Sequence, residues 1–141
     1  MGVLPLLTKL KRIDASNYAD LVLNMRKWTT QSHETAEFTF LLFDRFSNQV
    51  LANALEPLRA ANTFLSAPAY AWKIVTRDGA AVQSSAGMTI VPDGALDPTD
   101  RGSALIVLPS YGYRALATDA LSRQLRAAAA RFDALIGLDG G

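Results

Sequence analysis

Side chains that can do covalent chemistry are scarce in this 141-residue sequence. It contains no cysteine, which excludes disulfides, thiolate metal sites and a cysteine nucleophile. The only histidine, His33, lies in the polar stretch 29–35, so the rest of the chain has no imidazole to act as the base of a serine hydrolase. No glycine-rich phosphate loop is present either. We therefore predict no catalytic residue, no metal site and no cofactor.

Polar residues that follow predicted strands are better candidates for a binding site. In parallel α/β sheets, ligands bind in the crevice beyond the carboxyl ends of the strands. This rule nominates segments 44–47, 110–112 and 139–141 as the rim of any site. Within them, the candidate ligand contacts are Ser110, Tyr111, Gly112 and Asp139. Each has a plainer alternative, because 110–112 is also typical of a turn and Asp139 of a helix cap.

The elements that must position these residues are visible in the hydrophobic pattern. Helices are predicted over 47–64, with a bend or restart at Pro57, and over 118–131. Residues 83–91 favour a hairpin, and 92–102 favour a loop. Because strands and helices alternate, the pattern predicts βαβ units and a mostly parallel sheet between helix layers. The predicted strands are the short apolar runs 38–43, 72–76, 104–108 and 134–138.

The first 36 residues have a different character and are predicted to be an N-terminal extension. Apolar side chains recur at helical spacing from Ser16 to Trp28, and Ser16 can cap the first turn. This pattern predicts an amphipathic helix, which the polar linker 29–35 separates from the core. The core domain then comprises residues 37–141.

Composition and charge limit the classes of function. Half of the residues are hydrophobic and 19% are charged, which is typical of one soluble globular domain. The net charge of +1 gives no basic field of the kind that holds a DNA duplex. No apolar run approaches the roughly 20 residues that span a bilayer, and no signal peptide is apparent. We expect a cytoplasmic protein that does not contact membranes.

Several motifs, in their order and spacing, are similar to those of one known family. The most specific is the Glu-Pro-Leu-Arg-Ala-Ala-Asn block at 56–62, and the others lie at 40–46, 70–72, Gly79 and 84–87. Together they resemble the ThiJ/PfpI-like domain, a class I glutamine-amidotransferase-like domain, at the N-terminus of a group of AraC-family transcriptional regulators. The resemblance covers about residues 38–141.

The resemblance implies a fold and a candidate site. The fold is a flavodoxin-like three-layer α/β sandwich, in which enzymatic relatives carry a nucleophilic cysteine on a tight turn after a strand. Asp139 stands at that place, and a carboxylate is a poor substitute for a thiol. Glu56 stands where enzymatic relatives carry a supporting glutamate, and it is a candidate contact for a small nitrogenous metabolite. The alternative for Glu56 is a solvated carboxylate paired with Arg59.

The family domain normally continues beyond this turn and is followed by a helix-turn-helix domain. The resemblance therefore implies that 37–141 is the first half of a sensor domain, truncated at the nucleophile turn and with a sheet incomplete at its C-terminal side. DNA would be bound only through a missing C-terminal domain, and the apolar edge strand 134–138 favours a homodimer. The predicted function is a non-enzymatic ligand-sensing or interaction module. The alternatives are an amidase- or glyoxalase-like enzyme and a non-functional truncated remnant.

Overall fold

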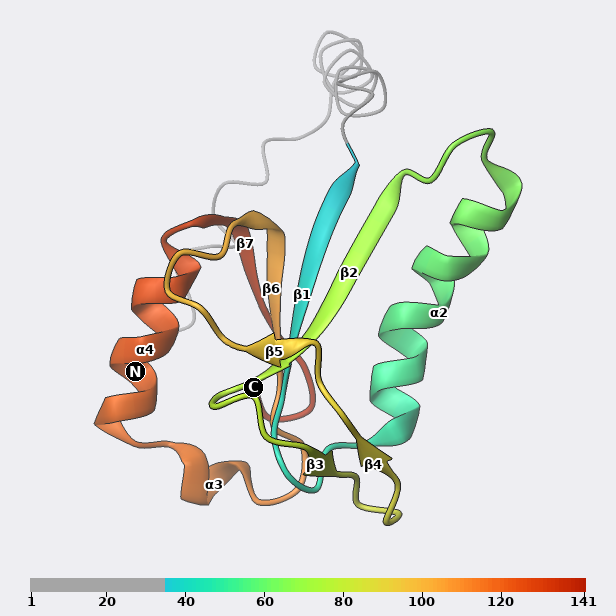
Figure 1. Ribbon diagram of the computed structural model, residues 1–141. Coiled ribbons are helices and arrows are strands. Elements are labelled where there is room, and N and C mark those ends of the chain that lie inside the picture. Colours follow the sequence, from blue (N-terminus) through green and yellow to red (C-terminus); the bar gives the residue numbers. More distant parts are fainter. Residues whose placement is uncertain (1–34) are drawn as a thin grey trace, which may run out of the picture. The chain divides into compact units, whose positions relative to one another are not determined.

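The computed structural model describes residues 35–141, which fold around one five-stranded sheet (Figure 1). The helix predicted for 16–28 lies outside the described residues, as does the linker as far as residue 34. The strand order is β5-β2-β1-β6-β7, and all four neighbouring pairs run parallel. The strands of this sheet are β1 (Ala36–Leu42), β2 (Tyr70–Thr76), β5 (Gly94–Ala95), β6 (Gly102–Leu108) and β7 (Phe132–Gly137).

Helices cover the two faces of the sheet. α2 (Asn48–Phe64) packs on one face and α4 (Asp119–Ala129) on the other (Figure 1). A short helix, α3 (Tyr113–Leu116), precedes α4, and a small antiparallel hairpin is formed by β3 (Val82–Gln83) and β4 (Thr89–Ile90). The predicted three-layer α/β fold with a mostly parallel sheet is confirmed.

The core follows from the alternation of side chains along the two central strands. In β1, Leu41 packs in the cluster that includes Leu121 of α4, whereas Phe40 packs in the cluster that includes Leu51 of α2. The same alternation along β6 sends Leu105 to the α4 side. Because both faces of these strands are covered, their sequences read as continuous apolar runs rather than as alternating patterns.

α2 begins and continues as its sequence dictates, with one correction. Ser47 caps the helix, since its Oγ accepts a hydrogen bond from the backbone N–H of Val50 at 3.4 Å. A bend or a restart was expected at Pro57, and the single helix from 48 to 64 shows that the helix does not restart there. Pro57 and Asn53 are both exposed, so water can satisfy the Asn53 carbonyl that Pro57 leaves without a donor.

The segment 92–102 is not the plain loop that its composition predicts. It contains β5, which pairs with β2 at the edge of the sheet. Asp93 directs this pairing because its backbone N–H donates to the Ile74 carbonyl at 2.8 Å and its carboxylate accepts from the Ile74 N–H at 2.7 Å. None of the helices within 35–141 is long and apolar enough to cross a membrane.

Candidate functional site

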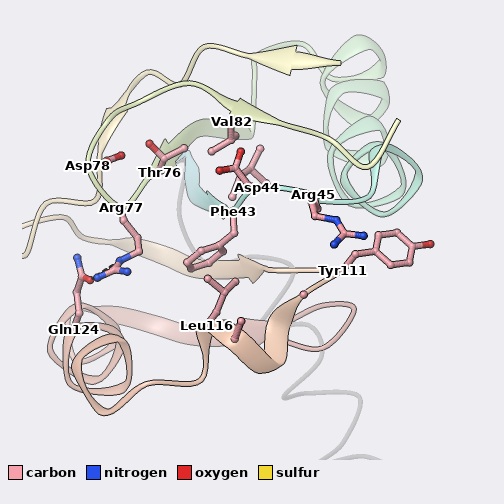
Figure 2. Close-up of a pocket in the computed structure, with 13 residues that line it drawn as sticks. Phe43, Asp44, Arg45, Thr76, Arg77, Asp78, Val82, Tyr111, Leu116 and Gln124 are labelled. Atoms are coloured by element: carbon pink, nitrogen blue, oxygen red, sulfur yellow. Dashed lines mark hydrogen bonds between the residues drawn. The ribbon is translucent and has the colours of Figure 1, made fainter. Parts of the chain in front are cut away.

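A cleft of about 680 Å³ opens at the carboxyl ends of β1, β2 and β6 (Figure 2). From β1 the chain moves to β2 on one side and later returns to β6 on the other side. Where the strand order reverses in this way, the connections that leave two adjacent strands run to opposite faces of the sheet. A crevice is left between them at the carboxyl ends of the strands. The cleft therefore lies where this topology favours ligand binding.

The turn after β1 forms one wall of the cleft and is tied to the β3–β4 hairpin. The Asp44 carboxylate accepts a hydrogen bond from the Gln83 N–H at 3.0 Å, and the Arg45 N–H donates to the Gln83 carbonyl at 2.6 Å. Arg45 adopts a left-handed backbone conformation with φ of 67°, which costs roughly 1 kcal/mol for a residue with a Cβ. The two hydrogen bonds to Gln83 hold this conformation.

Left-handed residues gather at the ends of the strands. Among the described residues, the three non-glycine residues with positive φ are Arg45 after β1, Ser110 after β6 and Asp139 after β7. Backbone strain of this kind clusters at functional sites, where the surrounding structure holds it in place. Within the described residues, all non-glycine residues with this backbone strain therefore lie at the carboxyl ends of strands.

Ser110 is a buried residue that directly precedes the cleft residues Tyr111 and Gly112 and does not itself line the cleft. Its side chain is buried, and its Oγ accepts a hydrogen bond from the Ser47 N–H at 2.9 Å. The end of β6 is thus tied to the start of α2. The next two residues, Tyr111 and Gly112, line the cleft itself, and the Tyr111 side chain is 57% exposed.

The opposite end of the cleft is formed by residues that sequence reasoning missed. Arg77 directly follows β2, and its Nε donates a hydrogen bond to Oε1 of Gln124 on α4 at 3.4 Å. Neither Arg77 nor Gln124 is among the candidate ligand contacts that the sequence predicts. The rule that nominated the ends of the other strands could have found Arg77, because it also applies to the end of β2.

Besides Ser110, two other predicted site residues do not line the cleft. The Glu56 carboxylate is exposed on α2 and forms an ion pair with the Arg59 guanidinium at 2.6 Å. Asp139 is exposed after β7, in a turn closed by a hydrogen bond from the Gly141 N–H to the Leu138 carbonyl. Among the predicted site residues, Tyr111 and Gly112 therefore line the cleft, whereas Ser110, Glu56 and Asp139 do not.

Curated proteins with sequences similar to part of this chain are transcriptional regulators. The chain is 40% identical over 90 residues to the HTH-type transcriptional regulator CdhR of Pseudomonas aeruginosa. The matched stretch covers 64% of this chain and 26% of that protein, so the chain spans about a quarter of the length of this curated relative. No protein-family model matches the chain.

Solved structures place the fold among regulators and ThiJ/PfpI proteins. An AraC family transcriptional regulator from Pseudomonas putida has a TM-score of 0.59 at 26% identity, over 72% of this chain and 55% of that one. A ThiJ/PfpI family protein from Pseudomonas syringae has a TM-score of 0.59 at 18% identity, over 93% of this chain and 50% of that one. The second likeness concerns the fold alone. The predicted resemblance to ThiJ/PfpI-like domains of AraC-type regulators is confirmed.

Proposed function

We propose that residues 35–141 sense a small polar metabolite on behalf of a transcriptional regulator. The observation that carries this proposal is the cleft at the carboxyl ends of β1, β2 and β6, which combines charged groups with apolar walls. The likeness to CdhR and to the AraC family regulator supplies the regulatory context. DNA contact belongs to a helix-turn-helix part outside the described residues, in keeping with the net charge of only +1.

We assign ligand contact to the wall formed by Tyr111 and Gly112. Ser110 acts through its bond to Ser47, which keeps that wall in place. A nitrogenous ligand stays a prediction from the resemblance. Asp44 lines the cleft, whereas Glu56 is exposed on α2 and paired with Arg59. Asp44 is therefore better placed than Glu56 to accept hydrogen bonds from such a ligand.

A non-catalytic role is part of the same proposal. The family resemblance puts Asp139 at the place of the nucleophile in enzymatic relatives, and a carboxylate is a weak nucleophile. The sequence has no cysteine that could replace it. We expect no amidase or glyoxalase turnover above the buffer rate, and turnover that is abolished by Asp139→Ala would contradict this expectation.

Thermal shift with a panel of small polar metabolites tests the sensing function. A ligand of the cleft should raise the melting temperature of the 141-residue chain, because it binds the folded state only. Tyr111→Ala should abolish most of that increase. The matched control is Phe64→Ala, which removes an aromatic ring that is 88% exposed and does not line the cleft. If every stabilising compound acts equally on the Tyr111→Ala variant, the proposed site is wrong.

A further inference from the structure

The end of β2 carries a guanidinium group that is hydrogen-bonded to a side chain of another element. Arg77 donates from Nε to Oε1 of Gln124, a residue 47 positions later in the sequence and on α4. Figure 2 shows the two side chains meeting at one end of the cleft. A guanidinium that is already oriented loses less conformational entropy when it binds a ligand.

The Arg77 guanidinium at this end of the cleft forms no ion pair with a carboxylate of the described residues. Within residues 35–141 the ion pairs are Arg59–Glu56 and Lys73–Asp100, so Arg77 takes part in none. The adjacent Asp78 carboxylate accepts the Ala80 N–H at 3.0 Å within its own turn. Asp78 also lines the cleft, but Figure 2 shows its carboxylate pointing away from the Arg77 guanidinium.

Neutral donors extend this positive end. The Gln124 oxygen faces Arg77, which leaves the amide N–H groups of Gln124 and the terminal N–H groups of Arg77 to donate elsewhere. A planar array of N–H donors with one positive charge matches the two oxygens of a carboxylate or the oxygens of a phosphate.

The rest of the cleft has a different character. Phe43 and Leu116 form its apolar middle, and Figure 2 shows them between the Arg77 end and the Tyr111 end. At the Tyr111 end, Arg45 lies next in the chain to the Asp44 carboxylate, so positive and negative groups occur together there. The Arg77 end is thus the place for an acidic group, and the middle suits a short apolar body.

We infer that the ligand of this cleft carries an acidic group, a carboxylate or a phosphate, that binds Arg77 at the end held by Gln124. This inference rests on the proposed sensing function and adds the chemical class of the ligand. Arg77 contacts the acidic group directly. Gln124 is a positioning residue, since it acts through the orientation of the Arg77 side chain.

Titration of the ¹⁵N-labelled 141-residue chain with four probes at constant pH and ionic strength tests the inference. Butyrate and inorganic phosphate separate the two acidic groups, and butyramide and butylamine supply the neutral and cationic comparisons. Butyrate or phosphate should shift the amide resonances of 76–78 and 124. Arg77→Gln should weaken that binding by roughly tenfold or more, because a charge-assisted bidentate contact is lost.

Two further variants test whether the acidic probes need the Arg77 charge free of a carboxylate partner. Gln124→Glu places a carboxylate beside Arg77 and should abolish binding of the acidic probes while the protein stays folded. Arg123→Gln removes a charge from the neighbouring exposed position on the same helix and should leave binding unchanged. Unchanged binding of the acidic probes by Gln124→Glu would show that Gln124 does not lie beside the group that binds them.

The outcomes distinguish this inference from the proposed function. Equal binding of butyramide or butylamine, or unchanged binding of butyrate and phosphate by Arg77→Gln, would overturn the acidic class and leave the cleft as a sensing site. The absence of any shift with both acidic probes also overturns the inference. The sensing function itself fails only if the metabolite panel gives no stabilisation that depends on Tyr111.

Discussion

Single polar side chains hold the carboxyl edge of the sheet in its shape. The Ser110 hydroxyl is buried and accepts the Ser47 N–H, while Ser47 in turn caps α2. A strained residue after β6 is thereby coupled to the first turn of a helix that follows β1. One hydroxyl group thus links the end of β6, next to the cleft residues Tyr111 and Gly112, to the start of α2.

Asn62, the last residue of the family-like block, has a structural role that its sequence position did not disclose. Its amide oxygen accepts the N–H groups of Ala69 and Tyr70 at 2.9 and 3.0 Å, and its amide nitrogen donates to the Tyr70 carbonyl at 2.7 Å. These bonds join the end of α2 to the start of β2. The Asn62 side chain of the block therefore stabilises the connection between α2 and β2, which does not require contact with a ligand.

We predict that Asn62→Ala lowers the free energy of unfolding by roughly 2 kcal/mol, because three backbone groups in a half-buried place lose their partner. Urea denaturation followed by circular dichroism measures the change. Asn53→Ala is the control, since Asn53 is exposed on the same helix. A loss no larger than that of the control would show that water replaces the Asn62 amide without cost.

Among the elements, the central strands were predictable and the connections were not. Runs such as 38–43 and 104–108 are apolar enough to mark strands covered on both faces, and they correspond to β1 and β6. β5 was missed because two residues carry no hydrophobic pattern, and its pairing depends on Asp93 bonding to a residue 19 positions away.

The candidate site was only partly predictable for the same reason. Tyr111 and Gly112 could be nominated because the carboxyl-end rule needs only the position of a strand. Gln124 could not, because its place at the cleft depends on how α4 packs against the sheet and on a bond to Arg77. Likewise, the exposed position of Glu56 depends on the rotation of α2, which the motif alone does not define.

The connection between β5 and β6 makes stability depend on acidic pH. Hydrogen bonds from the Thr99 hydroxyl at 2.6 Å and from the Thr99 N–H at 2.7 Å lower the pKa of Asp97 below its ordinary value. A carboxyl whose folded pKa lies below its unfolded pKa stabilises the fold above the unfolded value of about 4. This contribution is lost as the pH falls through the folded pKa.

Asp97→Asn should therefore make the melting temperature less sensitive to pH below about 4 than it is in the parent chain. Calorimetric scans at several pH values between neutrality and acid measure this dependence. Asp133→Asn, at an exposed position on β7, is the matched control. An identical pH dependence in the parent chain and Asp97→Asn would show that the Thr99 bonds contribute nothing to stability.

On the scale of the molecule, β7 is one of the two edge strands of the described sheet, opposite β5. It pairs with β6 on one side, and the side chains of Leu135 and Ile136 are 52% and 38% exposed. An apolar edge with unpaired backbone groups is a template for association with another chain. We propose that the 141-residue chain self-associates through this edge.

Leu135→Lys should shift the chain toward the monomer, because a charge on an edge strand disfavours pairing. Sedimentation velocity over about a hundredfold range of protein concentration measures the shift. Leu65→Lys, at a position that is 47% exposed after α2, should leave the association unchanged. A monomer at all concentrations in the parent chain would exclude the edge as an interface.

The central claim is that a small metabolite binds at the carboxyl ends of β1, β2 and β6. Amide chemical shifts recorded with a stabilising compound from the metabolite panel test it most directly. The account predicts that the largest changes fall in three separate segments, 44–46, 76–78 and 111–112, which meet only at the cleft. Changes confined to the exposed face of α2 around Glu56, or to the amino ends of the strands around Glu37 and Ala71, would contradict it.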